Sequence, residues 1–280
     1  MIQPLLICTD LDRTLIPNGE QPESPQARPL FRQLVSSPNI TLAYVTGRDQ
    51  VLVQDAIAEY ELPIPNFVIA DVGSTIYEIK NNQWLRLTDW DNQISVDWQY
   101  KTQPDLVAFF TDFDHIKLQE ITKQGLHKLS YYVSLDIELE PIITKIRAKL
   151  EAEKIQANII WSIDEKAQVG LLDILPISAN KYHAIACLMK KQNFTLDNTI
   201  FSGDSGNDLD VLMSPIKSIL VANAHLEVKE TIQSKIEQTG LKDSIYIAQG
   251  QSSKLNGNYS AGILEGIFHY FPDLQIESKN

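Results

Sequence analysis

Three nearly continuous apolar runs in the first quarter of the chain constrain the fold most strongly. They cover residues 5–8, 40–45 and 67–70, and they do not alternate between apolar and polar positions. Strands with this pattern are buried on both faces, which is typical of a parallel sheet covered by helices. Residues 49–60 carry apolar side chains at helical spacing and complete a strand–helix–strand unit. The sequence therefore predicts an α/β fold with a doubly wound, Rossmann-like parallel sheet.

The same pattern returns after residue 180, and between the two α/β segments the chain has a different character. The later segment is expected to form helices at 181–191, 226–236 and 260–271 and strands at 199–202, 218–221 and 245–247. The middle region is expected to form a hairpin at 74–87 that turns at Asn81 and Asn82, helices at 104–113 and 141–154, and strands at 128–135, 159–163 and 169–175. An α+β insert of this kind should form its own layer.

We therefore expect two domains. Residues 1–85 and 177–280 should form the α/β core, and residues 86–176 should form a smaller inserted α+β cap. Residues 17–29 and 249–258 are rich in turn formers and are the stretches expected to be flexible.

Composition narrows the class of partner. The formal net charge of −12 argues against nucleic acid, whose phosphates need a face rich in Lys and Arg. No apolar run approaches the roughly 18 residues that would span a membrane. The start of the chain lacks a basic region and a cleavage site, and Cys8 and Cys187 give no disulfide framework, so we expect a cytoplasmic protein. No heptad repeat or apolar stripe indicates an oligomer, and a monomer is expected.

Four short polar stretches carry the chemistry of this chain. They are residues 10–14, residues 46–48, Lys181 and residues 203–208, and each follows an expected strand or opens an expected helix. Parallel strands end at one edge of their sheet, where open α/β sheets collect their catalytic groups. We therefore expect the four stretches to form a single site for phosphate transfer.

Asp10 and Asp12 follow the first expected strand. One carboxylate could attack a phosphate while the other moves a proton, which is the minimum for hydrolysis in two steps. An Asp-x-Asp pair alone is more often a helix cap or a solvated turn, so the interpretation depends on the other stretches.

Asp204 and Asp208 follow the expected strand at 199–202. Gly203 and Gly206 would permit a tight backbone path that lets the two carboxylates converge on an ion. Ligands that are all oxygens favour a hard cation, Mg²⁺ before any transition metal. Taken alone, residues 203–208 are also a strong turn sequence.

Thr46, Gly47 and Arg48 follow the second expected strand. Thr46 and Gly47 could offer a hydroxyl and a backbone N–H to a phosphate oxygen, although such a pair also serves as a helix cap. Arg48 could contact phosphate or form a structural ion pair, and we favour the ion pair. Lys181 could offset the crowding of negative charge around Asp10, although a single lysine is more often a solvated surface charge.

Together these residues resemble the four motifs of the haloacid dehalogenase superfamily of phosphatases, in the expected order and beside the expected strands. The resemblance implies that Asp10 forms an aspartyl-phosphate and that Asp12 protonates the leaving alcohol and then activates water. Aspartate at position 12 favours a phosphatase over a dehalogenase. Thr46 and Lys181 would hold the phosphoryl group, with Gly47 and Asn207 as further substrate contacts.

The same resemblance implies an Mg²⁺ cofactor. The ion would be bound by Asp10, by the backbone carbonyl of Asp12 and by Asp204. Asp208 would support either the ion or Lys181.

The insert between Thr46 and Lys181 resembles the cap of a subgroup that mostly handles sugar phosphates and that sets specificity through this cap. Within the subgroup the chain is most similar to the sucrose-6-phosphate phosphatases, through residues 42–48, 72–77, 128–131, 172–176, 178–181, 203–208 and 260–265. By this similarity, the candidate contacts for sugar hydroxyls are Lys128, Ser130, Asp173 and Asn180. Ser130 and Asp173 could equally be structural residues on polar faces of cap strands.

Three features depart from the family pattern. Arg13 stands where asparagine is frequent, the segment after Thr14 is longer and rich in proline, and the loop at 249–258 looks extended. The leading hypothesis is an Mg²⁺-dependent phosphatase for sucrose-6-phosphate. The alternatives are a phosphatase for mannosylfructose phosphate, glucosylglycerate phosphate or another compatible-solute precursor, a sugar phosphomutase, and a non-catalytic binding module.

Overall fold

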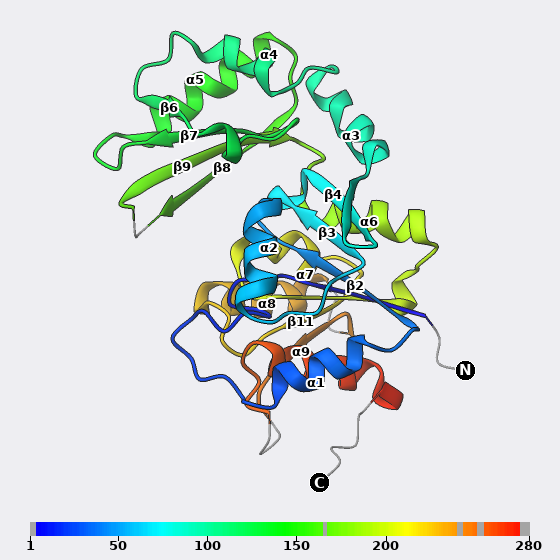
Figure 1. The fold of residues 1–280 in the computed structure, drawn as a ribbon. Coiled ribbons are helices and arrows are strands. Elements are labelled where there is room, and N and C mark those ends of the chain that lie inside the picture. The colour runs from blue at the N-terminus through cyan, green and yellow to red at the C-terminus, as the bar shows by residue number, and fades with distance from the viewer. Residues whose placement is uncertain (1–3, 165–166, 240–242, 251–254, 275–280) are drawn as a thin grey trace. The chain divides into compact units, whose positions relative to one another are not determined.

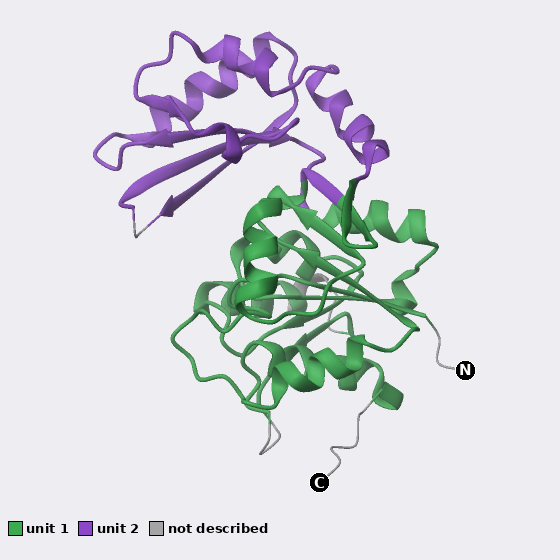
Figure 2. Cartoon of the chain, in the orientation of Figure 1, with its two compact units in different colours: residues 1–73, 77–85, 181–280 green, residues 74–76, 86–180 purple. Residues whose placement is uncertain are grey.

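The computed structural model describes residues 4–164, 167–239, 243–250 and 255–274 (Figure 1). The chain divides into two compact units, which Figure 2 shows in green and purple. The first unit contains residues 1–73, 77–85 and 181–280, and the second contains residues 74–76 and 86–180. Residues 74–76 and 177–180, predicted to belong to the core, therefore group with the inserted unit.

An eight-stranded sheet organises the first unit, and its strand order is β12-β11-β10-β1-β2-β3-β4-β5. The strands from β12 to β3 pair in parallel. Their bounds are β1 Leu5–Thr9, β2 Ile40–Val45, β3 Phe67–Ala70, β4 Thr75–Lys80, β5 Gln83–Arg86, β10 Thr199–Gly203, β11 Lys217–Leu220 and β12 Ile245–Ile247. Every residue of β1 is buried, as expected for a strand that is covered on both faces. The predicted α/β fold class is confirmed.

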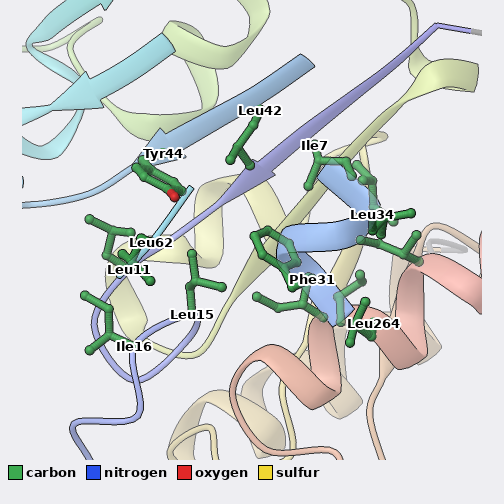
Figure 3. Close-up of a cluster of buried hydrophobic side chains, with 14 of the residues drawn as sticks. Ile7, Leu11, Leu15, Ile16, Phe31, Leu34, Leu42, Tyr44, Leu62 and Leu264 are labelled. Carbon is green, nitrogen blue, oxygen red and sulfur yellow. The ribbon is translucent and has the colours of Figure 1, made fainter. Parts of the chain in front are cut away.

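Helices pack against this sheet and close its core. They are α1 Ala27–Val35, α2 Gln50–Glu59, α6 Lys181–Gln192, α7 Leu209–Leu212, α8 Leu226–Thr239 and α9 Ser260–Tyr270. Figure 3 shows the cluster in which Phe31 of α1 and Leu264 of α9 meet Ile7 and Leu42 of the central strands. Helix α6 contacts α7 and β3. The packed sheet gives the strand ends a rigid support.

The second unit has its own sheet and its own core. Its four strands lie in the order β6-β7-β9-β8 and all pair antiparallel. The elements are α3 Thr88–Ser95, α4 Gln103–Val107, β6 Ile116–Leu118, β7 Leu129–Val133, α5 Leu139–Ala152, β8 Ala157–Asp164 and β9 Val169–Pro176. Ile146 of α5 packs with Tyr131 and Leu172 on one face of the sheet. This is the α+β composition that the sequence predicts for the insert.

Some predicted elements differ from the structure. The sequence pattern predicts neither α1, nor α3, nor β6, and the helix expected at 104–113 is the short α4 followed by a 3₁₀ turn at Ala108–Phe110. Residues 27–29, expected to be flexible, form the start of α1. Part of the other stretch expected to be flexible, residues 251–254, lies outside the described residues. Further 3₁₀ turns are Asp71–Gly73, Val96–Trp98, Ile121–Lys123, Leu196–Asn198, Gly206–Asp208 and Pro272–Leu274.

A helix that crosses a bilayer needs about 20 predominantly apolar residues. Within the described parts of the chain, no helix has both the length and the apolar character that this needs.

Candidate active site

Main-chain hydrogen bonds place three of the predicted polar stretches at one edge of the sheet. Asp10 follows β1, and its N–H donates to the carbonyl of Ser202 in β10 at 2.9 Å. Thr46 follows β2, and its N–H donates to the carbonyl of Ile69 in β3 at 2.8 Å. Asp204 follows β10. Because these strands run in parallel, their polar ends come together.

Lys181, the first residue of α6, joins two of these stretches. Its Nζ donates to Oδ1 of Asp10 at 2.9 Å, to Oδ1 of Asp208 at 2.7 Å and to Oδ1 of Asn207 at 2.9 Å. All three N–H donors of the ammonium are therefore engaged. Burial opposes the charged form, but the carboxylates of Asp10 and Asp208 outweigh it and raise the pKa of Lys181. Lys181 is a fixed, buried positive charge and not a solvated surface lysine.

Asp208 orders the turn that follows β10. Its Oδ2 accepts the N–H groups of Asp204 at 3.0 Å and of Ser205 at 3.1 Å. A Cβ at Gly203 would lie 2.6 Å from Cγ and Oδ2 of Asp208, so a side chain does not fit there. At Gly206 nothing lies within 4 Å of such a Cβ, and φ is not positive. The tight path predicted for this turn therefore requires glycine at position 203, and nothing around position 206 requires it.

Asp10, Asp204 and Asp208 form a buried acidic cluster, and each offers one oxygen within 4.8 Å of the others. Burial raises the pKa of Asp10 to about 8, against the opposing charge of Lys181. Burial and the neighbouring Asp208 raise the pKa of Asp204 to about 6. In both cases the effect of burial exceeds the opposing effect of the nearby positive charges, so the neutral form of each carboxyl group is favoured. An acidic, buried set of oxygen donors fits a hard divalent cation.

The carboxylate of Asp12 lies outside this cluster and is held by two other residues. Arg48 donates from Nε to Oδ2 at 2.8 Å and from Nη2 to Oδ1 at 2.7 Å, and Nδ2 of Asn18 donates to Oδ1 at 2.7 Å. Burial alone would raise the pKa of Asp12, but these hydrogen bonds outweigh it and lower the pKa. The structural ion pair favoured for Arg48 is confirmed. The expected metal contact of Asp12 is its backbone carbonyl, and that contact stays a prediction.

The loop after β2 holds Thr46 in a buried position. Its Oγ1 accepts the N–H of Arg48 at 3.2 Å. The alternative that Thr46 caps a helix is wrong, because Asp49 is the residue whose side chain caps α2. The N–H of Val72 donates to the carbonyl of Thr46 at 3.1 Å, and Val72 has a left-handed φ of 58°. A β-branched residue rarely adopts this conformation, so backbone strain lies at the edge of the site.

Three neighbours of the carboxylates were not found by sequence reasoning. Arg13 donates from Nε to Oδ2 of Asp204 at 3.2 Å, and Thr14 donates from Oγ1 to Oδ1 of Asp204 at 3.1 Å. Asn18 is the third, through its bond to Asp12. Thr14 belongs to the polar stretch at 10–14, so its place in that motif was the available signal. Arg13 belongs to the same stretch, whereas the contact of Asn18 depends on the path of the turn and has no comparable signal.

An open pocket of about 300 Å³ lies at this edge of the sheet. It is lined by Asp10, Asp12, Arg13, Thr46, Gly47, Arg48, Leu52, Asp204, Ser205 and Asn207. The structure thus brings the predicted core residues to one pocket, with Lys181 and Asp208 buried behind them. A phosphate group that entered this pocket would meet three carboxylates, those of Asp10 and Asp204 with raised pKa values and that of Asp12 with a lowered pKa.

The predicted sugar contacts lie in the second unit. Ser130 of β7 is paired with Asp173 of β9, and its Oγ donates to Oδ1 of Asp173 at 2.5 Å. Lys128 and Ser130 are buried, whereas Asp173 and Asn180 are partly exposed. The bond between Ser130 and Asp173 agrees with a structural role on a polar sheet face. Their contact with a sugar stays a prediction.

The match to known families decides the class of the protein. Residues 3–271 match the model of the sucrose-6F-phosphate phosphohydrolase family. The chain belongs to this family. It is therefore a member of a family of phosphatases, and the resemblance to the haloacid dehalogenase superfamily is confirmed.

Similarity to three other proteins extends over most of the chain. A protein of Nitrosococcus oceani, provisionally named a HAD-like hydrolase, is 50% identical over 273 residues, which are 98% of this chain and 73% of that protein. Sucrose-phosphatase 1 of Nicotiana tabacum is 28% identical over 95% of this chain, which spans 59% of the tobacco protein. Mannosylfructose-phosphate phosphatase of Agrobacterium fabrum is 28% identical over 80% of this chain and 85% of its own length.

A solved structure agrees with the fold of this family member. The sucrose-phosphatase of Synechocystis sp. PCC6803, solved in complex with sucrose and phosphate, gives a TM-score of 0.71 at 26% identity. The match covers 96% of this chain and 98% of that one. The chain therefore shares the fold of that phosphatase over nearly its whole length.

Proposed function

We propose that this protein is an Mg²⁺-dependent phosphatase that hydrolyses the phosphate ester of a disaccharide, with sucrose-6-phosphate as the first candidate substrate. The observation that carries the proposal is the pair of carboxylates in one pocket. Asp10 is buried against Lys181, and Asp12 is held in its ionised form by Arg48. The solved relative that holds sucrose and phosphate supports this class of substrate.

Asp10 and Asp204 would hold the Mg²⁺ ion together with the backbone carbonyl of Asp12. Asp208 would act indirectly, because its Oδ2 holds the turn at Asp204 and its Oδ1 holds Lys181. When bound, the ion supplies positive charge that favours the ionised form of Asp10 and offsets the charge of the phosphate.

In the first step an oxygen of Asp10 attacks the phosphorus atom, and the bond between phosphorus and the sugar oxygen breaks. Protonated Asp12 gives its proton to that sugar oxygen. Asp12 is ionised in the free pocket, so it must gain this proton as the substrate arrives. The negative charge of the incoming phosphate favours that, because a like charge nearby raises the pKa of a carboxyl group.

In the second step a water molecule attacks the phosphorus of the aspartyl-phosphate. Asp12 accepts a proton from the water, the bond between phosphorus and Asp10 breaks, and inorganic phosphate leaves. Thr46 offers its hydroxyl to the phosphoryl oxygens, with Gly47 beside it. Lys181 would contribute its charge, and it would reach the phosphoryl group directly by turning one N–H away from Asn207.

Specificity would come from the inserted unit. We assign residues 1–85 and 177–280 to the catalytic core and residues 86–176 to the cap, except that residues 74–76 and 177–180 group with the inserted unit. We assign the sugar hydroxyls to Lys128, Ser130, Asp173 and Asn180. Mannosylfructose phosphate is the second candidate substrate. The relative named for it is as similar to this chain as the tobacco sucrose-phosphatase, at 28% identity in each case.

We also infer that the protein acts in the cytoplasm as a monomer. Among the described residues neither Cys8 nor Cys187 forms a disulfide, which fits a reducing compartment. A molar mass near 31.6 kDa by light scattering would support the monomer, and a multiple of it would contradict it.

Phosphate release from a panel of sugar phosphates, with and without Mg²⁺, tests the proposal. The panel contains sucrose-6-phosphate, mannosylfructose phosphate, glucosylglycerate phosphate and glucose-6-phosphate. We expect Mg²⁺-dependent release with a preference for sucrose-6-phosphate, and no turnover by Asp10→Asn or Asp12→Ala. Transfer of phosphate within the sugar without release would indicate a mutase, and an inactive wild-type protein would indicate a binding module.

A further inference from the structure

Arg13 has a backbone conformation that arginine seldom adopts. Its φ is 59°, in the left-handed region that disfavours side chains other than those of Asn and Asp. Two asparagines hold it there. The N–H of Arg13 donates to Oδ1 of Asn18 at 2.8 Å, and Nδ2 of Asn223 donates to the carbonyl of Arg13 at 2.6 Å. The turn therefore fixes the point from which the arginine side chain starts.

From this point the guanidinium reaches a carboxylate of the acidic cluster. Nε of Arg13 lies 3.2 Å from Oδ2 of Asp204, and Nη2 lies 3.3 Å from the carbonyl of Asn223. The other oxygen of Asp204 accepts the hydroxyl of Thr14 at 3.1 Å. Both oxygens of this proposed metal ligand therefore have donors, and one of those donors is positively charged.

The two positive groups beside the cluster differ in their freedom to move. Lys181 is fully buried and is bonded to three acceptors, so it is part of the fixed frame. The Arg13 side chain is 30% exposed at the pocket wall and bonds to a single carboxylate. A divalent cation placed among the cluster oxygens would repel a guanidinium 3.2 Å from one of them. Of these two positive groups, the Arg13 guanidinium is the one that can move away from the cluster.

We propose that Arg13 competes with the divalent cation for Asp204. The guanidinium neutralises the cluster when the cation is absent and turns away from Asp204 into the open pocket when the cation binds. Arg13 is thus a positioning residue that sets the cation concentration at which the site fills. The inference rests on the metal site of the proposed function and needs neither the sugar substrate nor turnover.

Titration of the full-length, metal-free protein with MgCl₂ by calorimetry tests the competition. Arg13→Gln should bind Mg²⁺ about three- to tenfold more tightly than the wild type. Arg13→Asn should do the same and suits the left-handed backbone, so it keeps the test valid if glutamine disturbs the turn. Arg28→Gln is the matched control, because it removes the same charge from a residue bonded to Glu23 and not to the cluster.

Thermal unfolding gives a second readout that does not depend on activity. In EDTA, Arg13→Gln should melt below the wild type, because the cluster loses a neutralising charge. At saturating Mg²⁺ this difference should close or reverse. The proposed competition would be overturned if Arg13→Gln and Arg13→Asn kept the wild-type affinity for Mg²⁺. It would also be overturned if the control Arg28→Gln gained as much affinity as they do. If the wild type itself binds no Mg²⁺, the metal site of the proposed function fails instead.

Discussion

Arg48 holds Asp12 by a two-pronged ion pair, with Nε 2.8 Å from Oδ2 and Nη2 2.7 Å from Oδ1. Such a pair fixes the direction of the carboxylate as well as its charge. Nη1 of the same guanidinium donates to the carbonyl of Leu52 in α2 at 3.1 Å, so a helix supports the arginine. The end of β2 therefore orients the proposed proton-transfer group at the end of β1.

Replacing this arginine should change the pH profile of the enzyme. Arg48 favours the ionised form of Asp12 and lowers the pKa of that carboxyl group, so Arg48→Gln should raise the pKa of Asp12. Asp12 must be protonated to act as the acid, and the limb of kcat/KM that falls with rising pH should move to higher pH. We also expect kcat to fall about tenfold or more, because the carboxylate loses its orientation. A profile of unchanged shape in the variant would show that Arg48 does not control Asp12.

The turn at Gly203 should tolerate no side chain. In Gly203→Ala the new Cβ would lie 2.6 Å from Cγ and Oδ2 of Asp208, and the carboxylate that holds Asp204 and Lys181 would have to move. We expect a loss of about 2–4 kcal/mol in the free energy of unfolding, measured in urea. Gly206→Ala is the control, with open space around its Cβ, and should change stability by less than about 1 kcal/mol. Equal losses in the two variants would contradict the steric argument.

The sequence predicted the sheet well, because strands buried on both faces leave a continuous apolar pattern. It missed α1, whose third residue is Pro29. A proline is allowed there, since the first N–H groups of a helix have no partner inside it, but in the sequence it reads as a turn. It missed α3 because that helix buries only Trp90 and Ile94 as apolar residues. Strand β6 has only three residues, none of them buried, so it leaves no recognisable pattern of apolar residues in the sequence.

The candidate site was predictable to the extent that it depends on strand ends. Asp10 and Asp204 are placed by the backbone of β1 and β10, so their convergence follows from the order of parallel strands. The clamp between Arg13 and Asn223 joins residues 210 positions apart through side chains. No spacing rule reports where such side chains point after a turn, so these contacts required the structure.

Stability without metal should fall as the pH rises. Burial and Asp208 raise the pKa of Asp204 from 3.8 to about 6 in the folded state. Between these values the folded protein binds more protons than the unfolded chain, so the free energy of unfolding decreases with rising pH. The contribution of Asp204 is on the order of 2 kcal/mol. The raised pKa of Asp10 extends the decrease toward higher pH.

Urea unfolding in EDTA at pH 4.5 and pH 7 measures this decrease. Asp204→Asn should reduce the dependence of the free energy of unfolding on pH. Saturating Mg²⁺ should do the same for the wild type, because the ion compensates the charge of the ionised carboxylates. If the free energy of unfolding of the wild type rose with pH in EDTA, the raised pKa values of the buried carboxylates would be contradicted. The same holds if Mg²⁺ left this free energy unchanged.

Lys128 offers a way to separate sugar recognition from phosphate chemistry. It directly precedes β7, and Leu129 points into the core of the second unit, so Lys128 and Ser130 share the opposite face of the sheet. Loss of one charged hydrogen bond to a sugar hydroxyl costs about 1.5 kcal/mol or more, which is about tenfold in KM. Lys128→Ala should therefore raise KM for the preferred sugar phosphate about tenfold and leave kcat nearly unchanged.

A substrate without a sugar provides the decisive comparison for this variant. With p-nitrophenyl phosphate, which offers no hydroxyl groups to the cap, Lys128→Ala should match the wild type in both constants. Lys149→Ala removes the same charge from α5, the helix on the core face of the same sheet, and should behave as the wild type with either substrate. If Lys128→Ala raises KM equally for both substrates, the lysine supports the fold of the second unit, and the sugar contact assigned to it is wrong.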